Sequence, residues 1–142
     1  MNLARVPTMF WVVAIAGLLW NLFGLMMFWQ NLMMTPEAIA ALPDAQRQIS
    51  QANPRWTLVP FAIATGGGVL GTLLMLLRRR AAVLVLLLSL LALVVQFSAI
   101  YLVTPVWVLT GVSGAMFPVV LWIIAAALWL YARHAVRRGW LR

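Results

Sequence analysis

Apolar side chains in this sequence fall into four long runs, and polar residues interrupt them mainly at their ends. The runs cover about residues 9–29, 57–77, 81–101 and 115–133. A helix rises about 1.5 Å per residue, so each run is long enough to cross a hydrocarbon layer of about 30 Å. The pattern predicts four membrane-spanning helices in a single transmembrane domain over residues 1–142.

The hydrophilic stretch at residues 30–56 separates the first run from the second. It holds the sequence Thr35-Pro36-Glu37, which is typical of a helix start: a hydroxyl caps the end, proline fits the first turn, and an acid faces the positive dipole. We expect two short helices here, over about 38–42 and 45–52. They would form a compact extracytoplasmic cap lying on the membrane surface.

The links between the later runs are short. Only Arg78, Arg79 and Arg80 separate the second run from the third, so these two helices must be antiparallel neighbours. Residues 102–114 contain Pro105 and Gly111 among apolar residues, which indicates either a loop or a shallow interfacial half-helix. The predicted fold class is all-α: an integral membrane antiparallel four-helix bundle with a short helical cap between helices one and two.

The basic residues give the orientation. All ten are arginines, and in a four-span chain eight of them fall on one side: Arg5, Arg78, Arg79, Arg80, Arg133, Arg137, Arg138 and Arg142. Loops rich in arginine stay in the cytoplasm. We therefore predict a multi-pass protein of the bacterial inner (cytoplasmic) membrane with both termini inside. Its main topology determinants are the 78–80 triplet and the pair Arg137 and Arg138.

Composition supports lipid as the solvent. The chain is 65% hydrophobic and 8% charged, whereas soluble domains carry about 25% charged residues. The net charge of +8 comes from arginines at helix ends, so topology explains it better than nucleic-acid binding does. The predicted partners are membrane lipids, with self-association or a larger membrane complex as further alternatives and no nucleic acid.

Several chemistries lack the residues they need. The chain has no cysteine and no lysine, its two acids are Glu37 and Asp44 in the hydrophilic stretch, and its one histidine is His134 among the tail arginines. Ion-coupled carriers usually keep an ionisable residue inside the membrane, metal sites need several ligands, and nucleophilic catalysis needs a base. We predict no catalytic residue, no metal and no cofactor, and hence no enzyme.

Three polar residues lie at similar depths in the predicted helices: Asn21, Thr65 and Gln96. Two interpretations stay open for this layer. The first is hydrogen bonding between helices that fixes their packing, which contributes about 0.6–2 kcal/mol per bond. The second is a small polar pocket that binds a ligand and opens toward the outer leaflet.

Glycines in the second run form another candidate feature. Gly67 and Gly71 make a GxxxG pair next to Gly68. Glycine weakens a helix but lets a neighbouring helix approach closely, so we predict helix packing here, within the chain or between chains. A locally unwound helix that lines a ligand cavity is the alternative.

Three sequence features carry a resemblance over nearly the whole chain. They are Trp20-Asn21-Leu22-Phe23-Gly24, the stretch from Thr35-Pro36-Glu37 to Leu42-Pro43, and Gly139-Trp140. The chain resembles a group of small four-helix bacterial inner-membrane proteins that often carry the automatic label of sugar transporter and are loosely similar to DoxX-like proteins. The resemblance implies a four-helix fold and, through that label, transport.

Two functional hypotheses follow from these features. In the first, the chain is an accessory or structural membrane protein without catalytic chemistry that binds a lipid or another apolar ligand. In the second, it is a small facilitative transporter of an uncharged solute such as a sugar. A sugar site needs several hydrogen-bonding side chains, and the predicted helices hold few at membrane depth.

Overall fold

The computed structural model describes residues 5–142, and these residues form helices joined by short turns, with no strand among them. The four long helices are α1 (Thr8–Leu32), α4 (Leu58–Leu76), α5 (Ala81–Val103) and α6 (Val106–Arg137). By length and composition, each is apolar enough to cross a membrane. The predicted all-helical class with four such helices is confirmed.

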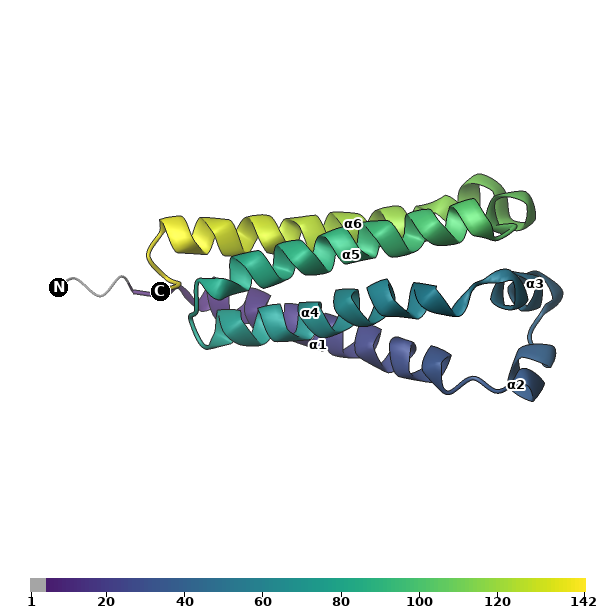
Figure 1. The fold of residues 1–142 in the computed structure, drawn as a ribbon. Coiled ribbons are helices and arrows are strands. Elements are labelled where there is room, and N and C mark those ends of the chain that lie inside the picture. The colour runs from purple at the N-terminus through teal and green to yellow at the C-terminus, as the bar shows by residue number, and fades with distance from the viewer. Residues whose placement is uncertain (1–4) are drawn as a thin grey trace.

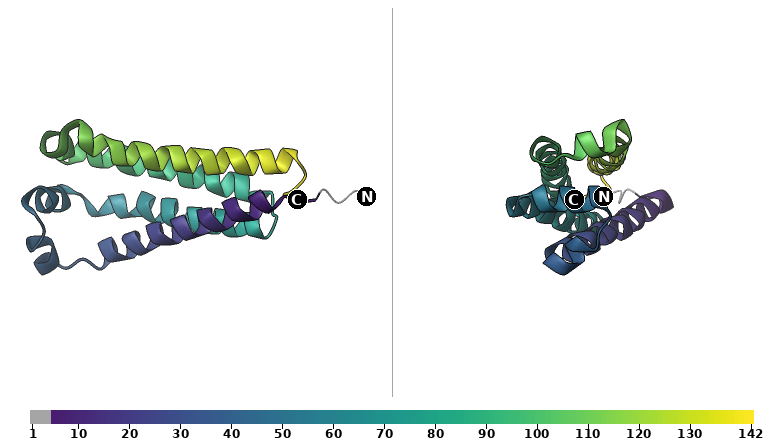
Figure 2. Two further views of the ribbon diagram at one scale, coloured as in Figure 1. Left: turned by 180° about the vertical axis from the view of Figure 1, so that it is seen from behind. Right: turned by 90° about the vertical axis from the view of Figure 1, so that its right-hand side faces the viewer.

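The long helices lie side by side (Figure 1). The start of α1, the C-terminal residues and the α4–α5 turn lie together at one end of the molecule, which we call the arginine end because it carries Arg78, Arg79 and Arg80. The short helices lie at the opposite end, the cap end. Extensive contacts join α4 to α5, α1 to α4 and α5 to α6. Helix α4 therefore packs between α1 and α5, and α6 packs beside α5 (Figure 2).

The cap end holds both short helices expected from the sequence, α2 (Pro36–Ala40) and α3 (Asp44–Ala52). The hydroxyl of Thr35 caps α2 by accepting a hydrogen bond of 3.2 Å from the backbone N–H of Ala38. Arg47 pairs with Asp44 and also donates to the carbonyl oxygen of Ala40 at 3.4 Å. These contacts lie within the segment itself. A short 3₁₀ turn, η1 (Arg55–Thr57), leads from it into α4.

Helix α6 starts earlier than the hydrophobic run indicates, at Val106 rather than at about residue 115. It is broken at Gly111, whose φ of 58° and ψ of −150° are essentially restricted to glycine. Residues 106–110 therefore form a short helical segment that meets the rest of α6 at a kink. This segment corresponds to the half-helix interpretation of residues 102–114. Pro118, by contrast, lies inside the continuous part of the helix.

All four long helices converge at the arginine end. The core there combines alanines with a few large side chains: Phe10, Ala14, Met75, Ala82, Leu86, Leu128, Ala132, Ala135 and Leu141. Helices α1 and α6 meet in this half, where the rings of Phe10 and Tyr131 stack at 6.4 Å and Gly17 lies against Leu128. The small alanines let the helices approach closely, and the space left toward the cap end holds a cavity.

Candidate functional site

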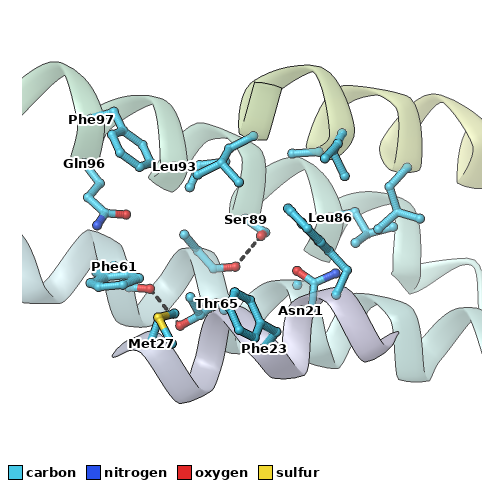
Figure 3. Close-up of a pocket in the computed structure, with 18 of the residues that line it drawn as sticks. Asn21, Phe23, Met27, Phe61, Thr65, Leu86, Ser89, Leu93, Gln96 and Phe97 are labelled. Carbon is cyan, nitrogen blue, oxygen red and sulfur yellow. Dashed lines mark hydrogen bonds between the residues drawn. The ribbon is translucent and has the colours of Figure 1, made fainter. Parts of the chain in front are cut away.

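The cavity lies among the four long helices and has a volume of about 310 Å³ (Figure 3). Its polar lining residues are Asn21, Asn31, Thr65, Ser89 and Gln96. The rest of the lining is glycine, alanine and large apolar or aromatic side chains, among them Trp20, Phe23, Met27, Phe61, Leu86, Leu93, Phe97, Phe117, Leu121, Ile124 and Leu128. The three residues predicted from the sequence as a polar layer, Asn21, Thr65 and Gln96, all line this one cavity.

Asn21 is held by its own helix. Its Nδ2 donates to the carbonyl oxygen of Gly17 at 2.7 Å. Its amide lies directly against Gly68 of α4, where a Cβ atom would come within 2.6 Å of the Asn21 Cγ. Gly17 is similarly crowded, because a Cβ there would meet Leu128 at 3.0 Å. Because Gly17 and Gly68 have no side chains, α1 packs closely enough for the Asn21 amide to lie between α4 and the cavity.

Thr65 uses its hydroxyl proton within α4, where Oγ1 donates to the carbonyl oxygen of Phe61 at 2.9 Å. Its methyl group faces Gly24 of α1. Among residues 5–142, no hydrogen bond joins Asn21, Thr65 and Gln96 to one another. The layer is therefore a shared lining rather than a hydrogen-bonded network between helices.

Ser89 is a lining residue that the sequence analysis did not single out. Its buried hydroxyl donates to the carbonyl oxygen of Ala64 at 2.5 Å and so joins α5 to α4. Gly67 of α4 lies opposite Ser89, because a Cβ atom added to Gly67 would come within 3.2 Å of the Ser89 Cβ. Gly71 lies against Leu86 in the same way. The GxxxG pair therefore packs against α5 of the same chain. The spacing of Ser89, Leu93 and Gln96 on one helical face was the signal that would have identified Ser89.

Gln96 differs from the other polar lining residues because its side chain makes no hydrogen bond to any other described residue. The side chain is only 4% exposed, and its Oε1 is buried without a hydrogen bond from any residue that the structure describes. In Figure 3 the amide reaches from α5 toward Phe61 on α4. A buried acceptor without a partner costs free energy, so this oxygen is placed to receive a hydrogen bond from a molecule in the cavity.

The cavity meets its surroundings between α1 and α6. The exposed lining residues all lie on these two helices: Trp20, Phe23 and Asn31 on α1, and Phe117 on α6. Phe117 is 64% exposed and packs edge-to-face against Phe97 at 6.4 Å. The entrance is therefore framed mainly by aromatic rings and lies on the side of the helices rather than in a polar loop.

The predicted topology determinants lie away from the cavity, at the arginine end. Arg78, Arg79 and Arg80 form the α4–α5 turn, Arg137 ends α6 and Arg138 follows it. Within residues 5–142 there is no group of three or more His, Asp or Glu side chains that could hold a metal ion.

No family model, curated protein or solved structure matches the chain.

Proposed function

We propose that the chain crosses a bacterial inner membrane four times as an antiparallel bundle, with both termini and the 78–80 turn in the cytoplasm and α2 and α3 outside. Four long apolar helices support this arrangement. So does the separation of charge, since the triplet and the tail arginines share one end while Glu37 and Asp44 lie in the cap helices at the other.

We further propose that the cavity binds an apolar, lipid-like ligand that carries one hydrogen-bond donor, and that the protein acts without catalysis. The observation behind this is the unpartnered Gln96 amide in an otherwise largely apolar cavity. A donor on the ligand would satisfy Oε1. Known ligand sites combine an apolar lining with a few placed polar groups in this way.

The volume limits the size of the bound part. A dry cavity of about 150 Å³ takes up benzene, so a cavity of about 310 Å³ suits a group of roughly a dozen non-hydrogen atoms. An entrance framed by Trp20, Phe23 and Phe117 would let a longer tail extend into the surrounding lipid. The ligand class is thus an uncharged amphiphile with a compact head or ring.

Facilitative transport of an uncharged solute is the second candidate, because the cavity reaches both Asn21 and Gln96. A sugar, however, needs several free hydrogen-bonding groups. Here Thr65 has already used its hydroxyl proton, and Asn21 donates to Gly17. The lining therefore favours an apolar ligand over a sugar.

The experiment is purification of the full chain in native lipid nanodiscs, followed by mass spectrometry of the small molecules that co-purify. We expect one compound to recur with the unaltered chain, to be depleted in Gln96→Leu, and to be retained in Ser98→Ala, a substitution on the same helix outside this cavity. Equal occupancy in all three, or no recurrent compound, would contradict the proposal. Sugar uptake by proteoliposomes that is lost in Asn21→Ala would favour transport instead.

A further inference from the structure

The turn between α4 and α5 is joined to the C-terminal residues by a set of hydrogen bonds. The backbone N–H of Arg80 donates to the carbonyl oxygen of Arg142 at 2.9 Å. In return, the backbone N–H of Arg142 donates to the carbonyl oxygen of Arg78 at 2.7 Å. Leu141, which directly precedes Arg142, is fully buried. Residues 78–80 and 140–142 therefore form one fixed unit rather than two loose segments.

The backbone of this unit explains how the arginines are placed. Helix α4 closes with hydrogen bonds from Arg78 to Met75 and from Arg79 to Leu74, and Arg78 takes the left-handed position with φ 56°. Glycine usually occupies that position. Helix α6 closes in the same way with Gly139, at φ 73°. An arginine that accepts the strained conformation is held with its side chain over the end of α6, where Nε donates to the carbonyl oxygen of Trp140.

The resulting surface carries no acidic side chain. We call it the arginine platform: Arg78, Arg79, Arg80, Arg137, Arg138 and Arg142. The two acids of the chain, Glu37 and Asp44, both lie at the cap end. Among the described residues, the one ion pair joins Asp44 to Arg47, which is also at that end. The Nη2 of Arg78 is buried and has no acceptor among the described residues. The platform therefore has no acidic side chain to pair with, and one of its buried guanidinium nitrogens has no acceptor among the described residues.

We propose that the arginine platform binds the phosphate of an anionic phospholipid. Guanidinium groups donate paired hydrogen bonds to phosphate oxygens, which suits a surface of fixed arginines. A lipid fits better than free phosphate because large apolar side chains beside the turn are exposed, with Leu77 at 68%. Acyl chains would cover these side chains while the headgroup meets the platform. This site is separate from the cavity and does not depend on a ligand there.

The test uses the full chain in detergent and measures lipid binding by native mass spectrometry with phosphatidylglycerol and, in parallel, phosphatidylcholine. The variant Arg79→Gln/Arg138→Gln removes two exposed charges whose side chains make no hydrogen bond within the described chain, so the unit at 78–80 and 140–142 keeps its contacts. The matched control, Arg47→Gln/Arg55→Gln, removes two charges near the cap end.

We expect phosphatidylglycerol to bind more tightly than phosphatidylcholine, and the platform variant to weaken its binding roughly 30-fold while the control stays within about twofold. Equal binding of the two lipids, or equal loss in the two variants, overturns the proposal. Inorganic phosphate at the same concentration should neither bind stably nor raise the melting temperature, and stabilisation by it equal to that by the lipid would also overturn it. If the double variant does not fold, Arg79→Gln and Arg138→Gln are measured singly against the same criteria.

Discussion

The Nε of Arg78 donates a hydrogen bond of 2.9 Å to the carbonyl oxygen of Trp140, across 62 positions of sequence. The bond joins the end of α4 to the end of α6. Both helices finish with the same backbone motif, but α6 uses Gly139 at the left-handed position while α4 uses Arg78. The side chain at position 78 therefore does something that glycine, the easier residue there, could not do.

Replacing Arg78 by glycine separates these two effects. Arg78→Gly relieves the left-handed strain of about 1 kcal/mol but loses the side-chain bond to Trp140. We expect hydrogen exchange at the backbone N–H of Arg142 to become at least several-fold faster, with exchange in α4 little changed. Unchanged or slower exchange at Arg142 would mean that the backbone bonds alone hold the tail.

Gly68 is predicted to be the least replaceable glycine of the 66–68 run. In Gly68→Ala the new methyl group would collide with the Asn21 amide, so α1 would have to move away from α4. We expect a loss of about 1–3 kcal/mol, measured as a lower melting temperature in detergent. Gly66→Ala is the control, since its Cβ meets nothing within 4 Å and alanine favours the helix. Equal effects of the two substitutions would contradict this packing.

Gln96→Leu should stabilise the protein when no ligand is bound. The substitution removes a buried acceptor that has no partner among the described residues. Its removal should raise the free energy of unfolding by about 1–3 kcal/mol. Thermal unfolding of delipidated protein measures it, with Ser98→Ala as the reference. A lower melting temperature for Gln96→Leu would show that the amide is already satisfied in the ligand-free protein.

Gly111→Ala tests the kink in α6. The φ of 58° with ψ of −150° disfavours every residue but glycine, whereas nothing lies near a Cβ at this position. The cost, about 1–3 kcal/mol, is therefore one of backbone conformation alone. We expect either that loss or a straightened helix, seen as a changed distance between spin labels at residues 107 and 123. A variant with unchanged stability and unchanged distance would rule out the kink.

Glu37 gives the cap a dependence on pH. Hydrogen bonding from its own backbone N–H, and then from the Thr35 hydroxyl, lowers the pKa of the carboxyl below its usual value. Because the folded pKa is lowered, its contribution is present above the unfolded pKa and is lost as the pH falls through the folded value. An NMR titration of Glu37 should show the lowered pKa, and Thr35→Val should raise it toward 4.5. The same pKa in both proteins would exclude the Thr35 bond.

The sequence predicts the long helices well because hydrophobic runs of this length leave little choice of structure. The cap helix α2 is also predictable, since the signal at Thr35 and Pro36 is local. The early start of α6 is not predictable, because the apolar residues 106–110 are compatible with a loop as well as with a helix. Only the unusual backbone at Gly111 separates the two segments, and a glycine in the sequence does not reveal its φ.

The cavity was predictable only in part. Counting residues along each predicted helix placed Asn21, Thr65 and Gln96 at a similar depth, and all three do line the cavity. Which of their groups are free could not be read from the sequence, because hydrogen bonds to carbonyls four residues earlier depend on rotamers. A single serine in an apolar run, Ser89 stands out only when its helical face is compared with that of Gln96, and its bond to Ala64 on another helix cannot be read from the sequence.

Most polar side chains of α1 and α4 are paired inside their own helix. Asn21 bonds to Gly17, Thr65 to Phe61 and Thr72 to Gly68. Such a helix can enter a bilayer singly with little exposed polarity, before any other helix has arrived. Helix α5 is different, since Ser89 bonds to α4 and the Gln96 Oε1 has no partner within residues 5–142, yet α5 is also the most apolar of the four long helices. If the chain crosses a membrane as proposed, the surplus of leucine and valine in α5 would offset the cost of burying these two groups in lipid, and association with α4 would come as the later step of assembly.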